Sequence, residues 1–333
     1  MYFPEASEVF QRILQPLPDA RVAVVGHTRP DGDCIGSQVG LCRVLNALGI
    51  SAKVLIADCL PRNLMPFVGN TPCLEMDATF NGSDHTPIFV DCADDLRCGN
   101  AIRAAFSHIW ANIDHHISNQ GYAQWNIVEP QRAATAEILA GMFLDLNMPV
   151  DAVTAQALYV GIATDTGQFR YPSSSQQVFE ICAELISRGA NPGAAAAALY
   201  ENESVHKVGL LSRFLKSLQF ECEGRVCIGK LRLEDYNATQ ASREHAEGFV
   251  NYPRSIEGVA IGAFIEELEN GVKCSLRCKD AKYRVDQLAQ VFGGGGHACA
   301  AGLTQTGRSV ELFYSELIAE LTRHLNKVPA DTA

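Results

Sequence analysis

Four short segments of the chain combine Asp and His residues in patterns that suit the coordination of metal ions. In chain order they are Gly26-His27-Thr28-Arg29-Pro30-Asp31-Gly32-Asp33, Val90-Asp91, Asp114-His115-His116 and Thr164-Asp165-Thr166-Gly167. Carboxylate and imidazole groups are ligands for Mn²⁺, Mg²⁺ and related divalent cations, whereas structural zinc sites usually include thiolates. Two such cations about 3.5–4 Å apart can activate a water for attack on a phosphoester, and a bridging aspartate would set this spacing. The segments therefore predict a metal-dependent phosphoesterase.

Each segment also has an ordinary structural interpretation. An Asp after a strand is frequently a helix N-cap or a turn residue, PDGD is a good turn sequence, and adjacent His residues occur in many surface loops. Any single segment would favour that interpretation. Together they favour one shared site, because we expect each to follow a strand, and the carboxyl ends of parallel strands line one crevice.

Hydrophobic patterning predicts the elements that would position these segments. The first part of the chain alternates short apolar runs with helical patterns, which is typical of a doubly wound parallel sheet with right-handed crossovers. The predicted strands are 21–26, 52–57, 86–91 and one within 107–113, and the predicted helices are 1–14, 34–49, 135–146, 153–164 and 176–188. Gly36, Ser37 and Gly40 would give the second helix a face of small residues.

A second, smaller α/β domain is predicted after a helical connection. Residues 194–218 are rich in helix formers. Beyond them, strands are predicted at 226–231, 259–265 and 272–277, and helices at 285–291 and 311–325. We therefore predict a first domain over 1–195, a helical linker over 196–219 and a second domain over 220–328.

Composition limits the classes of partner. A chain of 333 residues with 47% hydrophobic content can bury two cores. Its net charge of −11 disfavours binding to long duplex nucleic acid but leaves room for a local basic pocket. The twelve Cys residues include no CxxC pair, which indicates buried thiols in a reducing compartment rather than a zinc ribbon. With no apolar run near 20 residues and no signal-peptide pattern, we expect a cytoplasmic location and no membrane partner.

The motifs HTRPDGD, VDCAD, DHH and TDTG resemble those of the DHH phosphoesterase superfamily. The segment FGGGGHACAAG at 292–302 resembles the GGGH signature of the companion DHHA1 domain. The similarity spans nearly the whole chain and implies a DHH catalytic, metal-binding domain followed by a DHHA1 substrate-binding domain. Length and layout are most similar to the NrnA-type branch, which hydrolyses oligoribonucleotides of two to five nucleotides and removes the 3′-phosphate from 3′-phosphoadenosine 5′-phosphate (pAp).

This resemblance implies a role for each residue of the metal motifs. The residues that would hold the cations are His27 and Asp31 for one ion, Asp33, His115 and Asp165 for the other, and Asp91 as the bridge between them. Asp91, Asp114 and His116 would be catalytic, with Asp114 orienting the neighbouring histidines and His116 facing the substrate phosphate. The implied cofactors are two divalent cations, with Mn²⁺ favoured and Mg²⁺ or Co²⁺ as alternatives.

The resemblance also implies substrate-binding residues outside the metal motifs. Besides His116, they are Arg277, Gly294, Gly295, Gly296 and His297. Consecutive glycines let the backbone approach a ligand and expose amides to an anion, and a guanidinium can bind phosphate through two hydrogen bonds. The ordinary interpretations are a flexible linker and a solvated strand residue. Cys278 stands where relatives often have Ser, which puts one phosphate contact in doubt, and Asn251 and Arg254 are further candidates for lying near the substrate.

Alternatives stay open at the level of sequence. A branch of the same superfamily cleaves cyclic-di-AMP or its linear product pApA with similar motifs. A nucleotide-binding module without catalysis would carry related sequence features. The expected partners are short single-stranded RNA oligomers or small nucleotides, and a homodimer stays open as the assembly.

Overall fold

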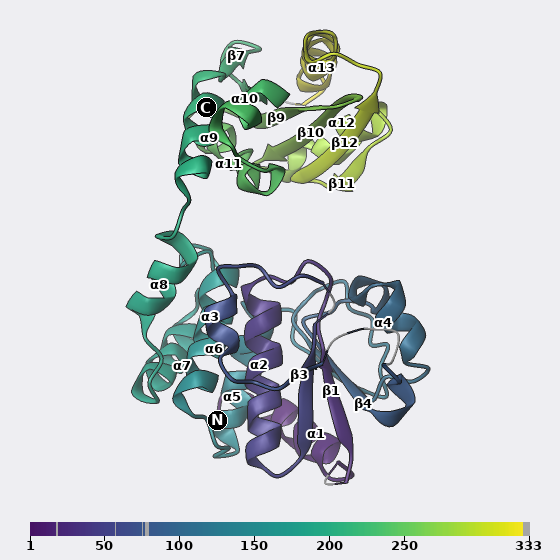
Figure 1. Cartoon of the computed structure of the whole chain (residues 1–333), viewed down its shortest axis with the longest axis vertical. Coiled ribbons are helices and arrows are strands. Elements are labelled where there is room, and N and C mark those ends of the chain that lie inside the picture. The colour runs from purple at the N-terminus through teal and green to yellow at the C-terminus, as the bar shows by residue number, and fades with distance from the viewer. Residues whose placement is uncertain (18, 57, 75, 77–79, 329–333) are drawn as a thin grey trace. The chain divides into compact units, whose positions relative to one another are not determined.

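The computed structural model describes residues 1–328 except 18, 57, 75 and 77–79, and it divides into two compact units, Met1–Asn202 and Glu203–Ala333 (Figure 1). Helices α8 (Pro192–Tyr200) and α9 (Val205–Lys216) occupy most of the stretch predicted as a helical linker, and the division falls between them. Among the described residues, none of the helices combines the length and apolarity needed to cross a bilayer.

The first unit is built on a parallel sheet of six strands in the order β3-β2-β1-β4-β5-β6. The strands are β1 (Arg21–Val25), β2 (Ser51–Leu55), β3 (Cys73–Leu74), β4 (Thr86–Val90), β5 (Ala111–Asp114) and β6 (Trp125–Val128). The direction of winding reverses between β1 and β4, so the predicted doubly wound sheet is confirmed. The short strands β3 and β6 were not predicted, and Ala57, the predicted end of the second strand, lies outside the described residues.

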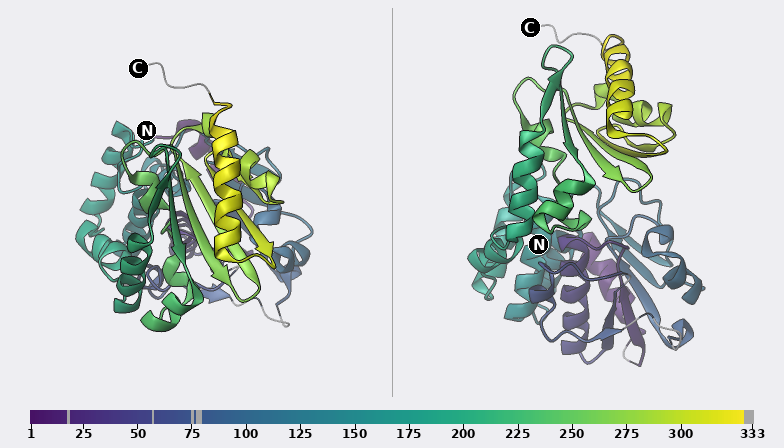
Figure 2. Two further views of the ribbon diagram at one scale, coloured as in Figure 1. Left: turned by 90° about the horizontal axis from the view of Figure 1, so that it is seen from above. Right: turned by 45° about the horizontal axis from the view of Figure 1, so that its top comes forward.

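Helices cover both faces of this sheet, as Figures 1 and 2 show. Alternate residues of β1 serve the two faces. Val22 and Val24 join the larger core, whereas Ala23 and Val25 join the smaller one. The larger core is closed by α1 (Pro4–Leu14), α2 (Gly32–Ala47), α3 (Met65–Val68), α5 (Thr135–Asp145), α6 (Ala152–Asp165) and α7 (Gln176–Ser187). The smaller core is closed by η2 (Asp95–Cys98) and α4 (Asn100–Ala105), and η1 (Gly82–Asp84) precedes β4.

The close packing of α2 on α6 depends on the small residues of α2. A Cβ added at Gly36 would lie 2.4 Å from the carbonyl oxygen of Ala157, and one at Gly40 would lie 2.6 Å from Cδ2 of Leu158. The predicted small-residue face is therefore the surface that lets the two helix backbones approach. This packing fixes the start of α2 near the end of α6.

The second unit holds a mixed sheet of six strands in the order β11-β12-β10-β9-β8-β7. Its strands are β7 (Gln219–Glu221), β8 (Val226–Leu231), β9 (Ile261–Leu268), β10 (Gly271–Cys278), β11 (Gly295–His297) and β12 (Ala300–Thr306), and only β8 and β9 pair in parallel within the described sheet. One face packs on α12 (Val285–Val291) and α13 (Val310–Leu325), with η4 (Ala281–Tyr283) nearby (Figure 2). The other face packs on α9, α10 (Leu233–Thr239), η3 (Arg243–Ala246) and α11 (Asn251–Ser255).

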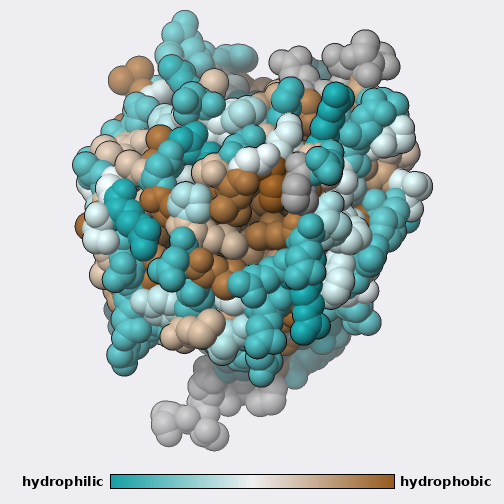
Figure 3. All heavy atoms as spheres, turned by 90° about the horizontal axis from the view of Figure 1, so that it is seen from below, coloured by the Kyte–Doolittle hydropathy of each residue, from teal (hydrophilic) through white to brown (hydrophobic). Residues whose placement is uncertain are grey.

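The surface mixes apolar and polar side chains. On the face in Figure 3, hydrophobic residues gather at the centre among hydrophilic ones. The large apolar side chains left exposed include Leu48, Met65 and Leu96. Exposed apolar side chains are normal on a folded chain.

Replacing Gly36 with Ala is expected to destabilise the first unit by about 1–3 kcal/mol, because the added methyl group would push against the backbone of α6. Urea denaturation measures this loss. Gly209→Ala in α9 is the matched control, since its nearest neighbour would be an ordinary 3.4 Å contact with Thr239, and there alanine should stabilise the helix by about 0.5–1 kcal/mol. Equal stability of Gly36→Ala and the wild type would contradict the close helix contact.

Candidate metal centre

The loop after β1 places His27 and the first turn of α2 at the carboxyl edge of the sheet. His27 is buried, and its Nδ1 donates to the carbonyl oxygen of Thr28 at 2.8 Å, which leaves the Nε2 lone pair free. That Nε2 is 3.8 Å from Oδ1 of Asp31 and 3.4 Å from Oδ2 of Asp91. Asp31 is the N-cap of α2, and its Oδ1 accepts a hydrogen bond from the Cys34 amide at 3.0 Å. His27 therefore lies beside both Asp31 and Asp91.

Asp91 lies between two histidines. It follows β4 directly, its amide donates to the Ile113 carbonyl on β5 at 3.0 Å, and its φ of 53° is uncommon for a residue other than glycine. Oδ2 faces Nε2 of His27, whereas Oδ1 is 3.6 Å from Nε2 of His115. The hydroxyl of Thr135 donates to Oδ1 at 3.2 Å and helps to hold this orientation. One carboxylate thus presents its two oxygens to two different groups of candidate ligands.

His115 joins a second group of carboxylates. Its Nδ1 donates to the carbonyl oxygen of Arg132 at 3.2 Å, so its Nε2 is also left as a lone pair. This Nε2 is 3.3 Å from Oδ2 of Asp165 and 3.9 Å from Oδ2 of Asp33. Potential ligand atoms of Asp33, His115 and Asp165 all lie within 4.8 Å of one another. The spacing suits a cation among them.

The prediction that all four segments follow strands was wrong for the fourth. Asp165 is the last residue of helix α6, not the residue after a strand. It reaches the centre because α6 packs along α2, whose first turn carries Asp33. The convergence of the segments is real, but one of them arrives on a helix.

Asp33 also caps the N-terminus of α5. Its Oδ2 accepts a hydrogen bond from the Thr135 amide at 2.7 Å, and its Oδ1 accepts one from the Ala136 amide at 2.8 Å. The N-cap of α5 is Ala134, whose methyl side chain cannot accept hydrogen bonds from these amides. Asp33, fully buried, therefore supplies the cap from another helix, and the helix N-terminus in turn stabilises its negative charge.

The centre concentrates negative charge in a buried place. Burial and the nearby charge of Asp33 raise the pKa of Asp91 well above its ordinary value. Burial, followed by the charge of Asp33, raises the pKa of Asp165 to about 8. Burial alone would lower the pKa of His27, but hydrogen bonds to Asp31 and Asp91 raise it. Buried like charges, together with two Nε2 atoms that face carboxylates and can serve as ligands once deprotonated, fit divalent cations, which would neutralise the carboxylates.

His116 belongs to a separate hydrogen-bonded chain at the rim of the centre. Its Nδ1 donates to Oδ1 of buried Asp114 at 2.8 Å, and Asn119 donates to Oδ2 at 2.6 Å. Burial opposes ionisation of Asp114, but the hydrogen bonds from His116 and Asn119 lower its pKa. Within the described residues, Asp114 contacts His116 in this way and makes no hydrogen bond to His115. Asp114 therefore orients His116, whereas His115 is oriented by the carbonyl oxygen of Arg132.

Sequence patterns missed four residues around the centre: Cys34, Arg97, Asn119 and Thr135. Potential ligand atoms of Cys34, His27 and Asp91 lie close enough together to share a metal ion. Burial raises the pKa of the Cys34 thiol to about 11, however, so the thiol stays protonated and is a poor ligand. Thr135 begins a predicted helix, which could have marked it as a capping residue. The others belong to no motif.

In the second unit, β-sheet register sets the predicted substrate residues on one face. Arg277 on β10 pairs with Ala300 on β12 and with Gly262 on β9, and Ala300 pairs with His297 on β11. Paired residues of adjacent strands point to the same face. Burial, followed by the charge of nearby Arg254, lowers the pKa of Arg277. This face thus carries two guanidinium groups and an exposed imidazole.

The glycine segment contains an edge strand of the second sheet. Gly295–His297 forms β11 and pairs with β12. Gly296 has a φ of 145°, and a Cβ there would lie 2.4 Å from the Ala300 carbonyl oxygen, so glycine is required. A Cβ at Gly294 would lie 2.4 Å from the carbonyl oxygen of Gly302. The run therefore permits close strand pairing at this edge.

Cys278 lies away from the face that carries Arg277. Its side chain is buried in the core under α12 and α13, and its Sγ donates to the Asp280 carbonyl oxygen at 3.1 Å. In a strand, neighbouring side chains point to opposite faces. The Cys278 side chain therefore points into the core, away from the face where a phosphate contact was in doubt.

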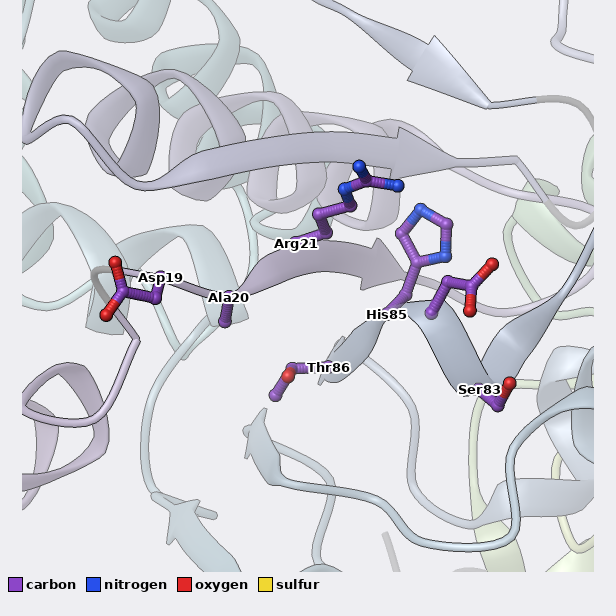
Figure 4. Close-up of a pocket in the computed structure, with 7 residues that line it drawn as sticks. Asp19, Ala20, Arg21, Ser83, His85 and Thr86 are labelled. Atoms are coloured by element: carbon purple, nitrogen blue, oxygen red, sulfur yellow. The ribbon is translucent and has the colours of Figure 1, made fainter.

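A pocket at the opposite edge of the first sheet is separate from this centre. Figure 4 shows its lining, which comes from the segment before β1 and from the segment around the start of β4. Its residues are Asp19, Ala20, Arg21, Ser83, Asp84, His85 and Thr86. Ligands of a doubly wound sheet bind at the carboxyl ends of its strands, whereas this pocket lies at the amino ends.

Both units match known protein families. Residues 21–162 match the N-terminal domain of the DHH family, and residues 224–326 match the DHHA1 domain. The bifunctional oligoribonuclease and PAP phosphatase NrnA of Thermus thermophilus is 29% identical over 307 residues, which cover 92% of this chain and 90% of that protein. The Bacillus subtilis protein of that name is 24% identical over 281 residues, covering 83% and 86%. The exopolyphosphatase-related protein of Bacteroides fragilis has the same fold, with a TM-score of 0.85, 24% identity and coverage of 97% and 98%.

The metal-free protein is expected to lose stability as the pH rises from about 4 to 8. Asp91 and Asp165 have raised pKa values, so the folded state holds protons that the unfolded chain has released. The raised pKa of His27 acts with the same sign above about pH 6.5. The lowered pKa values of Asp31 and Asp114 act with the opposite sign, mainly below about pH 5. Urea denaturation in EDTA should show a loss of at least about 1.4 kcal/mol, the equivalent of one pKa unit.

Asp165→Asn is the comparison for this prediction, because it removes one carboxyl group whose pKa is raised. The variant should show a smaller loss over the same range. Stability that stays level or rises between pH 4 and 8 in the metal-free wild type would contradict the charge crowding described above.

Proposed function

Because the chain belongs to the DHH family, with a DHH domain followed by a DHHA1 domain, we propose that it is a two-metal phosphoesterase for short oligoribonucleotides and pAp. The DHH catalytic domain would cover 1–195 and the DHHA1 substrate-binding domain 220–328, with a helical linker between them. We further propose that it acts in the cytoplasm.

One observation supports the two-metal mechanism above all others. The two oxygens of Asp91 face the free Nε2 atoms of two different histidines, His27 and His115, at 3.4 and 3.6 Å. Each histidine has a further carboxylate beside it, Asp31 in one case and Asp165 in the other. A carboxylate between two such groups is the arrangement that a bridging ligand requires.

The proposed ligands are His27 and Asp31 for one cation, Asp33, His115 and Asp165 for the other, and Asp91 for both. When bound, the two cations would lower the pKa of a water near the phosphorus and neutralise charge on the phosphoryl oxygens. Mn²⁺ is favoured because the donor set is rich in carboxylates with two imidazoles, and Mg²⁺ or Co²⁺ are alternatives.

The protein's own groups would hold and orient the reacting phosphate. Asp114 keeps the proton of His116 on Nδ1, so Nε2 is a hydrogen-bond acceptor in the resting state, where it accepts from Nη1 of Arg97 at 3.0 Å. On protonation, this nitrogen could donate to a phosphoryl oxygen or to the leaving oxygen. Asp114 would act through His116 as a positioning group. His116 would be the residue that contacts the substrate.

The second unit offers groups that suit the remainder of a nucleotide. Arg277 and His297 share one face of the sheet, with Ala300 between them in register. We propose that Arg277 binds a second phosphate and that His297 donates to a phosphate or stacks on a base. Gly294, Gly295 and Gly296 would let the substrate approach the backbone of this edge.

The substrate assignment rests on the relatives. The proteins from Thermus thermophilus and Bacillus subtilis are named for both oligoribonuclease and PAP phosphatase activity. A net charge of −11 is consistent with a short substrate rather than a long duplex. Hydrolysis of cyclic-di-AMP or pApA is the alternative within the same superfamily, and a nucleotide-binding module without catalysis is the alternative outside enzymes.

Asp91→Asn is expected to lower Mn²⁺-dependent hydrolysis by at least about 1,000-fold, because an amide would not bridge two cations as a carboxylate does. Asn also tolerates the φ of 53° at this position, so backbone strain does not confuse the result. The assay compares pAp, RNA di- to pentanucleotides, a longer RNA, pApA and cyclic-di-AMP. Preference for pAp and the shortest RNAs is the expected outcome.

Asp84→Asn is the matched control, since Asp84 is exposed at the other edge of the same sheet. It should keep wild-type activity. An Asp91→Asn protein with near-normal turnover would refute the bridging role. A wild type that turns over none of these substrates with Mn²⁺ would favour the binding module.

Arg277→Ala is expected to raise KM by about 10–100-fold with a smaller change in kcat, because a charge-assisted hydrogen bond to phosphate contributes about 1.5–3 kcal/mol. Steady-state kinetics with pAp measures both constants. Lys273→Ala is the control, since Lys273 is an exposed residue of the same strand and face. Equal KM values for Arg277→Ala and Lys273→Ala would remove Arg277 from the proposed substrate site.

A further inference from the structure

Arg97 lies beside the candidate metal centre, in the short helix η2 that follows β4. Asp94 accepts hydrogen bonds from the amides of Leu96 and Arg97 at 2.9 and 3.2 Å. The carbonyl oxygen of Arg97 accepts bonds from the amide of Thr28 at 2.7 Å and from its hydroxyl at 3.1 Å. The backbone of Arg97 is therefore fixed between the loops that follow β1 and β4, and its side chain starts from a rigid position.

The side chain of Arg97 ends on His116. Its Nη1 is 3.0 Å from Nε2 of that residue. Because Nδ1 of His116 donates to Asp114 at 2.8 Å, Nε2 is the acceptor and the guanidinium is the donor. The same Nδ1 is 3.7 Å from Oδ1 of Asp91. One imidazole ring thus separates Arg97 from the proposed bridging carboxylate.

The positive charge of Arg97 has no carboxylate partner within the described part of the chain, where the bond to His116 is the one hydrogen bond of its guanidinium. Arg103, on the neighbouring helix α4, pairs with Asp95 at 2.8 Å instead. Arg97 is half-buried, and a partly desolvated guanidinium normally has an anionic partner. Its Nε and Nη2 form a free pair of donors with the spacing of two phosphate oxygens.

We propose that Arg97 binds the phosphoryl group that reacts, donating from its Nε and Nη2 edge to the non-bridging oxygens. The inference rests on the proposed function, because it assumes that a phosphoester enters at the metal centre. A fixed guanidinium at this point would stabilise charge that grows on those oxygens in the transition state. Arg97 would then be a catalytic residue that acts beside His116.

The test compares Arg97→Met, Arg97→Lys and the matched control Arg103→Met in the full-length protein with Mn²⁺. Arg97→Met should lower kcat/KM for pAp by about 100–1,000-fold, the usual cost of losing one transition-state donor. Arg97→Lys should fall between that variant and the wild type, because it keeps the charge but loses the paired donors. Arg103→Met should match the wild type. Thermal unfolding checks that each variant is folded.

Binding of inorganic phosphate gives a readout that does not depend on turnover. Isothermal titration calorimetry with Mn²⁺ present should show at least about tenfold weaker phosphate binding in Arg97→Met. The same change made in a His116→Ala background should again weaken phosphate binding by a similar factor. A direct contact with phosphate survives the loss of the histidine, whereas an effect exerted only through that histidine would disappear.

The outcomes separate this inference from the proposed function. A wild type without Mn²⁺-dependent hydrolysis would overturn the proposed function, and phosphate binding would then decide the role of Arg97 alone. An active wild type with Arg97→Met within about twofold of it in kinetics and phosphate affinity would overturn only this inference. Loss of the effect in the His116→Ala background would also overturn it, and would leave Arg97 as a positioning residue.

Discussion

Electrostatic repulsion among buried carboxylates is the constraint around which the first unit is organised. Asp33 and Asp91 are both buried, and Asp165 lies beside them at the end of α6. Such a cluster is unfavourable without cations, and only a rigid surrounding structure can hold it together. That rigidity comes from the parallel sheet, the close packing of α2 on α6, and main-chain carbonyl oxygens that fix the two histidine rings.

The sheets of the two units carry side chains of different charge. In the first, the edge at which the winding reverses collects acidic and imidazole groups from four parts of the chain. In the second, antiparallel register places cationic and imidazole groups in one row across the strands. An acidic edge suits cations, and a face with cationic groups suits an anion.

Much of this arrangement could be predicted from sequence, for identifiable reasons. β1 and β4 are apolar runs bounded by turn residues, so their ends and the adjacent candidate ligands could be located. β3 and β6 are too short to give a pattern, and β11 consists mostly of glycine, which indicates a loop until its pairing partner is known. Asp165 was assigned to the wrong kind of element although the helix before it was predicted. The contacts of Arg97 and Asn119 depend on segments distant in sequence, so local patterns could not identify them.

The cap that Asp33 provides to α5 affects how descendants of this protein should be judged. Removing its carboxylate would leave the amides of Thr135 and Ala136 buried without acceptors, at a cost of about 1–3 kcal/mol each. Natural selection would therefore preserve an acidic residue at this position even in a lineage that had ceased to turn over substrate. An acidic residue at this position in a relative is therefore weak evidence that the relative is still active.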